Sequence, residues 1–218
     1  MTQRGWFVLL SLYMLALLGL GLVCGPLEAI LPGLLCILQS QSVLLSDYLA
    51  IGGIGAALVN AGLVGMAGLL LAYLNGVPLL GPIIAAVFTM AGFGLFGKNV
   101  LNIWPIILGV AVFSRVVRRP FKSYILVAMF GTALAPLVSQ VAYGLGLGLL
   151  PGLLFGLATG FLLPPLAVYM LRLHQGFNIY NVGLTCGFLG LFITSLLEGV
   201  GLQASPSLHW STQYLSLI

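Results

Sequence analysis

The sequence predicts an all-α integral membrane protein with about seven transmembrane helices. Three observations support this fold class: 61% of the 218 residues are hydrophobic, only 5% are charged, and the mean hydropathy is +1.21. So few charges cannot cover the surface of a soluble domain. The 30 glycines follow no collagen-like period, and such a glycine content is typical of transmembrane helices that pack closely. We therefore expect residues 1–218 to form a single transmembrane domain.

Apolar runs that could cross a hydrocarbon core of ~30 Å divide the chain into seven segments. They cover residues 6–25, 50–73, 79–97, 100–114, 121–141, 147–173 and 177–197. The first resembles a signal peptide, but its apolar run is long for one and no small-residue cleavage site follows, so we expect an uncleaved span. The fourth is short and is interrupted at Trp104-Pro105, where the proline removes a backbone donor.

Two segments do not fit a span. The apolar part of residues 26–48 is too short to cross and ends in a polar cluster, which predicts a re-entrant or interfacial segment. Residues 198–218 form a polar tail.

The basic residues predict the topology. With a cytoplasmic N-terminus, Arg4, the run RVVRRPFK at 115–122 and Arg172 all fall on the cytoplasmic side, as the positive-inside rule requires. The C-terminus then lies outside. Lys98 is the exception, because it falls at the outer end of a span or within the membrane.

Two stretches of the chain resemble each other. LLGP at 79–82 matches LLPP at 162–165, and each is followed by a G…NV pattern. The three-segment units 50–114 and 121–197 would run in opposite senses, as a 3+3 inverted repeat. Inverted repeats whose polar or broken helices meet near the midplane are typical of transporters and channels. The alternative is that the opposite senses of the two units follow simply from the odd number of segments in each.

Polar side chains within the apolar segments mark the candidate site. Such groups usually face a cavity or a partner, although they also hold helices together. GKNVLN (97–102) and HQGFNIYN (174–181) each combine amides with a glycine, so their donors and acceptors could replace the hydration shell of a small polar solute. We expect the substrate path to be lined by Asp47, Lys98, Asn99, Asn102, His174, Asn178, Tyr180 and Asn181.

Two of these residues have more than one interpretation. Lys98 could hold an anion, pair with Asp47, or extend to the lipid headgroups. His174, next to Arg172, could act in the path or lie at the cytoplasmic surface without a role.

Composition argues against most chemistry. Three acidic residues and two histidines supply no credible metal set, catalytic triad or carboxylate pair. Gly97-Lys98 is followed by Asn99, not by the Ser or Thr of a P-loop. We therefore expect no enzyme activity, cofactor, metal or nucleic-acid partner.

The leading functional hypothesis is a channel or a passive or secondary transporter for a small polar solute. The competing hypothesis is a non-transporting scaffold, or a subunit of a larger complex, whose polar residues only hold helices together. A membrane-embedded enzyme acting on lipid is a third, weaker alternative.

Three stretches carry a resemblance to a known family: 42–64 (SVLLSDYLAIGGIGAALVNAGLV), 94–110 (GLFGKNVLNIWPIILGV) and 174–190 (HQGFNIYNVGLTCGFLG). Over roughly residues 26–197 the chain resembles an uncharacterised bacterial multipass family, a domain of unknown function whose members are longer. The resemblance implies a bacterial inner-membrane protein that corresponds to their N-terminal half. It also implies assembly with a second copy or a second half-protein.

The order of features is distantly similar to half of a urea-transporter-type channel. Gly176-Phe177-Asn178 and Gly183 are similar to an element that lines the pore in that family, whereas the family's paired Asn-Asn-Pro segment is not found. This resemblance implies a channel-like architecture and leaves the solute open.

Overall fold

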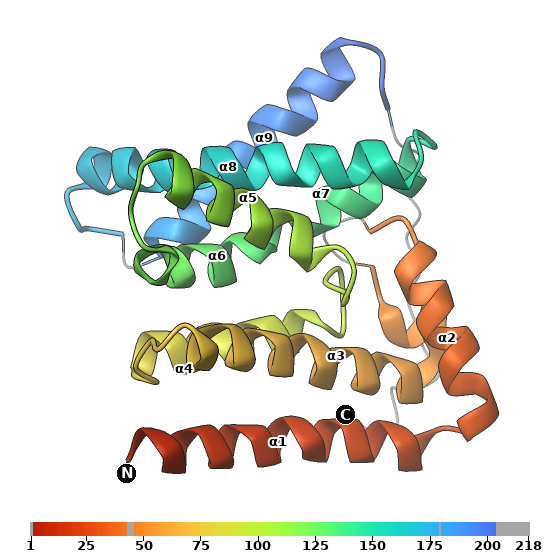
Figure 1. Ribbon diagram of the computed structural model, residues 1–218. Coiled ribbons are helices and arrows are strands. Elements are labelled where there is room, and N and C mark those ends of the chain that lie inside the picture. Colours follow the sequence, from red (N-terminus) through yellow and green to blue (C-terminus); the bar gives the residue numbers. More distant parts are fainter. Residues whose placement is uncertain (1, 43–45, 179, 204–218) are drawn as a thin grey trace.

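The computed structural model describes residues 2–42, 46–178 and 180–203, and the regular elements in these ranges are helices (Figure 1). The long α-helices are α1 (Gln3–Cys24), α3 (Tyr48–Leu74), α8 (Leu149–His174) and α9 (Asn181–Gly199). The short ones are α2 (Leu27–Gln39), α4 (Gly81–Phe93) and α5 (Ile103–Val116). Residues Phe121–Gly144 form one long helical segment. It is built from η1 (Phe121–Tyr124), α6 (Ile125–Gly131), η2 (Thr132–Leu134), α7 (Ala135–Ser139) and the π-helical η3 (Gln140–Gly144).

The all-α, membrane-type fold class is confirmed, whereas the number of spans is not. Among the described residues, five segments are long and apolar enough to cross a membrane: Gln3–Cys24, Tyr48–Leu74, Phe121–Gly144, Leu149–His174 and Asn181–Gly199. The predicted spans 79–97 and 100–114 instead contain α4 and α5, of 13 and 14 residues. At 1.5 Å per residue these helices are only ~20 Å long, which is short of a ~30 Å hydrocarbon core.

Glycines explain why the predicted span 79–97 is interrupted. A Cβ on Gly94 would lie 2.6 Å from the Ala61 backbone of α3, so only glycine allows this approach. Gly97 has φ +88°, a left-handed conformation that glycine adopts without strain. The chain therefore leaves the helix at Phe93 and re-enters one at Ile103. We call residues 94–102, between α4 and α5, the tip segment.

Close glycine contacts pack the helices into two halves (Figure 1). In the first half, α1–α4, Gly21 approaches the Gly55 carbonyl of α3, so that α1 lies directly on α3. In the second half, α5–α9, Gly160 of α8 approaches the Ile106 carbonyl of α5. Such small residues let helix backbones come close together. The tip segment is the covalent connection between the halves.

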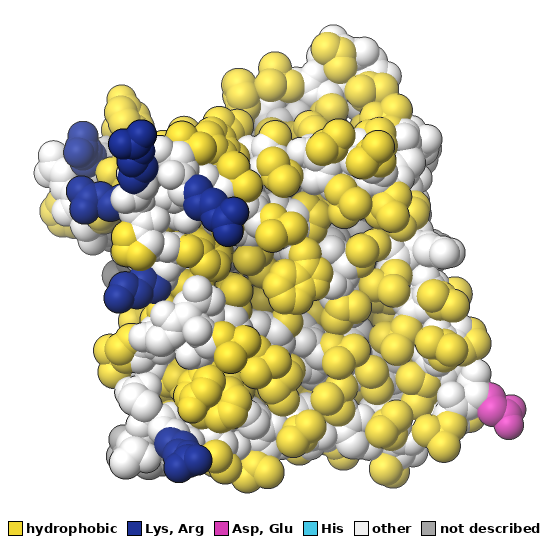
Figure 2. All heavy atoms as spheres, viewed as in Figure 1, with side chains coloured by type: hydrophobic (Ala, Val, Ile, Leu, Met, Phe, Trp, Pro, Cys, Tyr) yellow, Lys and Arg dark blue, Asp and Glu magenta, His cyan; other side chains and the backbone are white. Residues whose placement is uncertain are grey.

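The exposed Lys and Arg side chains lie toward one end of the molecule. Figure 2 shows the Lys and Arg side chains on this face gathered on the left, where α1 begins, where α5 and α8 finish, and where η1 begins. The 75–80 loop is at this end too, because the Leu79 N–H donates a 2.6 Å hydrogen bond to Gln3 Oε1. We call this the basic end. The 145–148 turn lies at the opposite end.

The proposed repeat units do not contain the same elements. Unit 50–114 holds α3 and the two short helices, whereas unit 121–197 holds the segment Phe121–Gly144 and two long helices. The inverted repeat therefore stays a prediction. The re-entrant or interfacial character of residues 26–48 also stays a prediction. In this stretch α2 packs on α3, with Gly33 against the Gly52 carbonyl. Residues 204–218 of the predicted polar tail lie outside the described residues.

Candidate functional site

The tip segment is anchored to α3 by Asn60, which is fully buried. The Asn60 Nδ2 donates hydrogen bonds to the carbonyls of Gly94 (2.6 Å) and Lys98 (2.8 Å). Its Oδ1 accepts a 3.3 Å hydrogen bond from the Val100 N–H. One amide therefore satisfies three backbone groups of the segment that separates α4 from α5.

Asn99 forms the turn of the tip segment and ties it to the first half. Its Oδ1 accepts hydrogen bonds from the N–H groups of Leu101 (3.0 Å) and Asn102 (2.8 Å). Its Nδ2 donates to the Ile37 carbonyl at the end of α2 (3.3 Å) and to the Tyr48 hydroxyl (3.5 Å). The side chains of Asn99 and Tyr48 are both 0% exposed. The end of α2 and the start of α3 therefore cover the tip segment.

Asn102 ties the tip segment to the second half. Its Oδ1 accepts a 2.9 Å hydrogen bond from the Asn99 N–H. Its Nδ2 donates to the Gly97 carbonyl (2.9 Å) and to Ser139 Oγ (3.0 Å), where α7 ends. Asn102 and Ser139 are 1% and 2% exposed. A buried amide network therefore joins α2, α3, the tip segment and α7.

The backbone carbonyl of Lys98 belongs to this network, but its side-chain ammonium does not. The side chain is 1% exposed, and its Nζ has no hydrogen-bond partner among the described residues. It lies 5.0 Å from the centre of the Phe93 ring, an attractive cation–π arrangement.

Asp47 lies beside the tip segment but acts as a helix cap. Its Oδ1 accepts hydrogen bonds from the Leu49 N–H (2.9 Å) and the Ala50 N–H (3.3 Å) at the start of α3. Its backbone pairs with Phe96 in an isolated antiparallel bridge. Pairing with Asp47, one of the three interpretations of Lys98, is not seen, because the Lys98 Nζ has no hydrogen-bond partner among the described residues. The carboxylate instead satisfies the exposed amides of a helix N-terminus.

The second predicted motif, 174–181, forms the turn between α8 and α9. His174 Nδ1 accepts hydrogen bonds from the N–H groups of Gly176 (3.2 Å) and Asn178 (3.3 Å). The ring proton is therefore assigned to Nε2, which lies 2.8 Å from Asn181 Oδ1. Asn178 Oδ1 accepts from the Tyr180 N–H, and Asn181 Nδ2 donates to the Ala167 carbonyl at 3.2 Å. These polar groups close a turn at a helix end.

The structure does not bring the two motifs together. The tip segment is buried, whereas Phe177 and Tyr180 in the 174–181 turn are 92% and 73% exposed. Figure 1 places this turn at the left, with the ends of α8 and α5, and the tip segment at the right. Of the predicted path residues, only Lys98, Asn99 and Asn102 share one polar centre, with Asp47 beside it.

Three residues of this centre were missed in the predicted path, namely Tyr48, Asn60 and Ser139. The sequence signal for Asn60 is that it is an amide within the long apolar run 48–74. That signal is equally typical of an amide that holds helices together. The sequence carries no signal for Tyr48 or Ser139, because their proximity to Asn99 and Asn102 depends on long-range packing.

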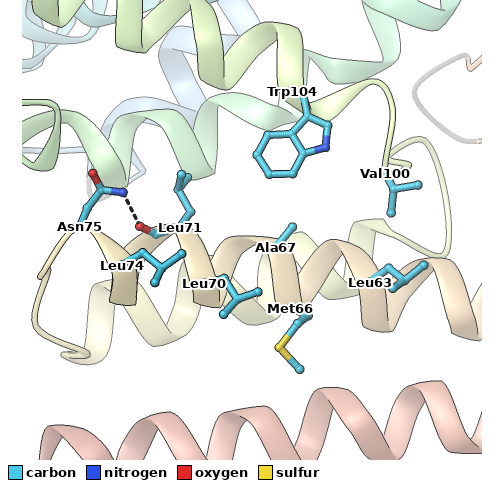
Figure 3. Close-up of a pocket in the computed structure, with 9 residues that line it drawn as sticks. All are labelled: Leu63, Met66, Ala67, Leu70, Leu71, Leu74, Asn75, Val100 and Trp104. Carbon is cyan, nitrogen blue, oxygen red and sulfur yellow. Dashed lines mark hydrogen bonds between the residues drawn. The ribbon is translucent and has the colours of Figure 1, made fainter.

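An apolar groove borders the tip segment at Val100. It has a volume of about 520 Å³ and lies between α3 and the start of α5 (Figure 3). Its lining consists of Leu63, Met66, Ala67, Leu70, Leu71, Leu74, Asn75, Val100 and Trp104. The only polar lining side chain, Asn75, donates a 2.8 Å hydrogen bond to the Leu71 carbonyl. This groove suits an acyl chain better than a polar solute.

Within residues 2–42, 46–178 and 180–203, no group of three or more His, Cys, Asp or Glu side chains could hold a metal ion. The three cysteines are free, and only Cys186 is buried.

The family described as "Protein of unknown function (DUF1576)" matches residues 27–199. The chain belongs to this family. The matched range of this DUF1576 protein runs from α2 to α9 and includes the whole amide network. No curated protein and no solved structure gives a significant match. Because the family description names no activity, the function must be argued from the site itself.

Proposed function

We propose that this DUF1576 protein is a channel or secondary transporter for a small polar solute, with its centre at the tip segment. One observation carries the proposal. Two helices too short to cross a membrane meet at a buried polar segment that holds an unpartnered lysine. Non-helical backbone at membrane depth is tolerated only where protein buries it or where it lines a cavity. Broken helices of this kind supply the solute sites of many secondary transporters.

Helix positions support a tip segment at membrane depth. Asn60, which binds it, lies seven residues after the break in α3 at Gly53. Ser139 lies five residues before the end of Phe121–Gly144. At 1.5 Å per residue, these positions lie roughly 8–10 Å inside the helix ends. That depth lies within a hydrocarbon core of ~30 Å.

The orientation belongs to the same proposal. The basic end of the molecule faces the cytoplasm by the positive-inside rule, so the N-terminus is cytoplasmic and α9 ends outside. The outward apolar side chains of α1, α8 and α9 suit contact with the lipid of a bacterial inner membrane. Lipid or a second copy of the chain could cover α9, where Phe188, Leu191 and Phe192 are exposed.

The second candidate is a non-transporting membrane subunit. Its supporting observation is that Asn60, Asn99 and Asn102 are buried and bonded to one another's backbone or to neighbouring helices. Amides of this kind also serve simply to hold helices together. A transporter and a scaffold would thus share this geometry. They differ in whether the amide network at the tip segment opens to water.

Solute flux distinguishes the two candidates. Purified protein is reconstituted into vesicles, and swelling or tracer uptake is measured for urea, small amides, polyols and small organic ions. The proposal expects flux of at least one solute above that of empty vesicles. It also expects Asn102→Leu to abolish this flux and Asn181→Leu, in the 174–181 turn, to retain it. If no solute permeates, and the substitutions change only stability, the chain is a scaffold.

A further inference from the structure

Of the seven Lys and Arg residues, Lys98 alone does not lie at the basic end. All the others occur near the start of α1, in the α5–η1 connection or near the end of α8. Lys98 is held in the tip segment by the hydrogen bond from Asn60 to its carbonyl and follows the left-handed Gly97. Its buried position is therefore built by the fold and is not that of a side chain that extends to the surface.

The carbonyl groups around Lys98 are already hydrogen-bonded to amides. Asn60 donates to the carbonyls of Gly94 and Lys98, and Asn102 donates to the carbonyl of Gly97. The Lys98 Nζ donates to none of them. These carbonyls of the tip segment are thus occupied by neutral donors.

No acidic side chain balances the charge. Asp47 caps α3 through Oδ1, and Glu28 and Glu198 are exposed near helix ends. The Phe93 ring centre lies 5.0 Å from the Lys98 Nζ, and the Cys186 thiol of α9 donates to the Phe130 carbonyl. A thiol is a weak donor and acceptor and does not neutralise an ammonium. A buried ammonium without a counter-charge is strongly unfavourable, so burial alone favours the neutral amine and a bound anion would favour the charged form.

We propose that Lys98 binds a small monovalent anion, a halide or a short carboxylate, and that this anion is the solute class of the site. This inference rests on the proposed transport function. The anion supplies the missing counter-charge, and a single ammonium with no second basic group matches a single negative charge. The side chain is enclosed, which favours a small ion.

Thermal stability in an anion series tests the site independently of flux. The melting temperature of the purified full-length protein is measured against sodium chloride and sodium formate, with sodium gluconate holding the ionic strength constant. Wild type is expected to show a saturable rise with chloride or formate. In Lys98→Met the rise should disappear, or its midpoint should move at least tenfold higher. Arg119→Met, which removes an exposed charge from the basic end, should keep the wild-type rise.

Lys98→Met retains the length of the side chain and removes an unpartnered charge, so the fold is expected to persist. Lys98→Gln provides a second variant with the same expected loss. The inference is overturned if wild type shows no anion dependence, or if both Lys98 variants keep it. Flux of a neutral solute without anion binding would overturn the anion site and leave the transport proposal standing. Saturable anion binding without any flux would support the site and contradict transport.

Discussion

Asn60 on α3 and Lys98 in the tip segment are joined by a 2.8 Å hydrogen bond from the Asn60 amide to the Lys98 carbonyl, across 38 positions of the sequence. The same amide binds Gly94 at 2.6 Å. These bonds hold the interrupted backbone against an otherwise apolar helix, and they set the position of the lysine.

Substitution of Asn60 should therefore destabilise the protein strongly. Asn60→Leu leaves the carbonyls of Gly94 and Lys98 and the Val100 N–H without their partner. Each unsatisfied buried group costs about 1–3 kcal/mol, and partial relaxation leads us to expect a loss of about 2–4 kcal/mol in total. Reversible unfolding in mixed micelles measures this change. Asn75→Ala, which removes one partly buried amide bond at the end of α3, should cost under about 1 kcal/mol. Equal effects of the two substitutions would contradict the anchoring role.

The packing of α5 on α8 should depend on Gly109. A Cβ at this position would contact the Leu157 carbonyl and lie 2.7 Å from the Phe161 nitrogen. Gly109→Ala should therefore lower the free energy of unfolding by about 1–3 kcal/mol, the usual range for overpacking. Gly92→Ala on α4, where nothing lies within 4 Å of a new Cβ, should be neutral or slightly stabilising. The comparison uses the same unfolding assay, and a larger loss for Gly92→Ala would contradict the close α5–α8 approach.

The topology can be measured by labelling single cysteines in a cysteine-free background. Phe177→Cys and Lys122→Cys introduce thiols at exposed positions of the basic end, and both should react from the cytoplasmic side. Leu147→Cys, in the turn at the opposite end, should react from outside. Impermeant maleimides applied to intact cells and to inverted vesicles give the side for each position. Labelling of positions 122 and 147 from one side would rule out the arrangement.

Trp104 should report a groove that is open to lipid. It lines the apolar groove between α3 and α5 and is 41% exposed. In a Trp6→Phe, Trp210→Phe background, lipids brominated on the acyl chains should quench Trp104 fluorescence, and aqueous iodide should have little effect. Quenching by iodide alone would mean that the groove is filled with water.

Hydropathy predicts the long helices of this chain well, because a long apolar run has few alternatives to a helix. Leu149–His174 lies within two residues of the predicted segment 147–173. The break after Phe93 could not be predicted in this way. It depends on the approach of Gly94 to Ala61 and on the bonds from Asn60, which join residues distant in sequence.

The candidate site was predicted only in part, because its contacts also join residues distant in sequence. GKNVLN was selected as an unusual polar cluster, and it forms the centre of the amide network. HQGFNIYN has a similar composition, yet its His174 and Asn181 close a turn between two helices. Sequence alone cannot separate these cases, since amides satisfy a buried loop and a helix end with the same chemistry.

The central claim is that the buried amide network opens to water during function, and the accessibility of Ser139 tests it most directly. Ser139 is 2% exposed and bonds Asn102 from the second half of the molecule. In a cysteine-free background, Ser139→Cys in reconstituted vesicles is treated with a charged, water-soluble methanethiosulfonate reagent, with Phe177→Cys as the exposed reference. The account predicts slow but complete modification of position 139, with a rate that changes when chloride or formate replaces gluconate. Full modification of position 177, with none at position 139 in any of these salts, would contradict it.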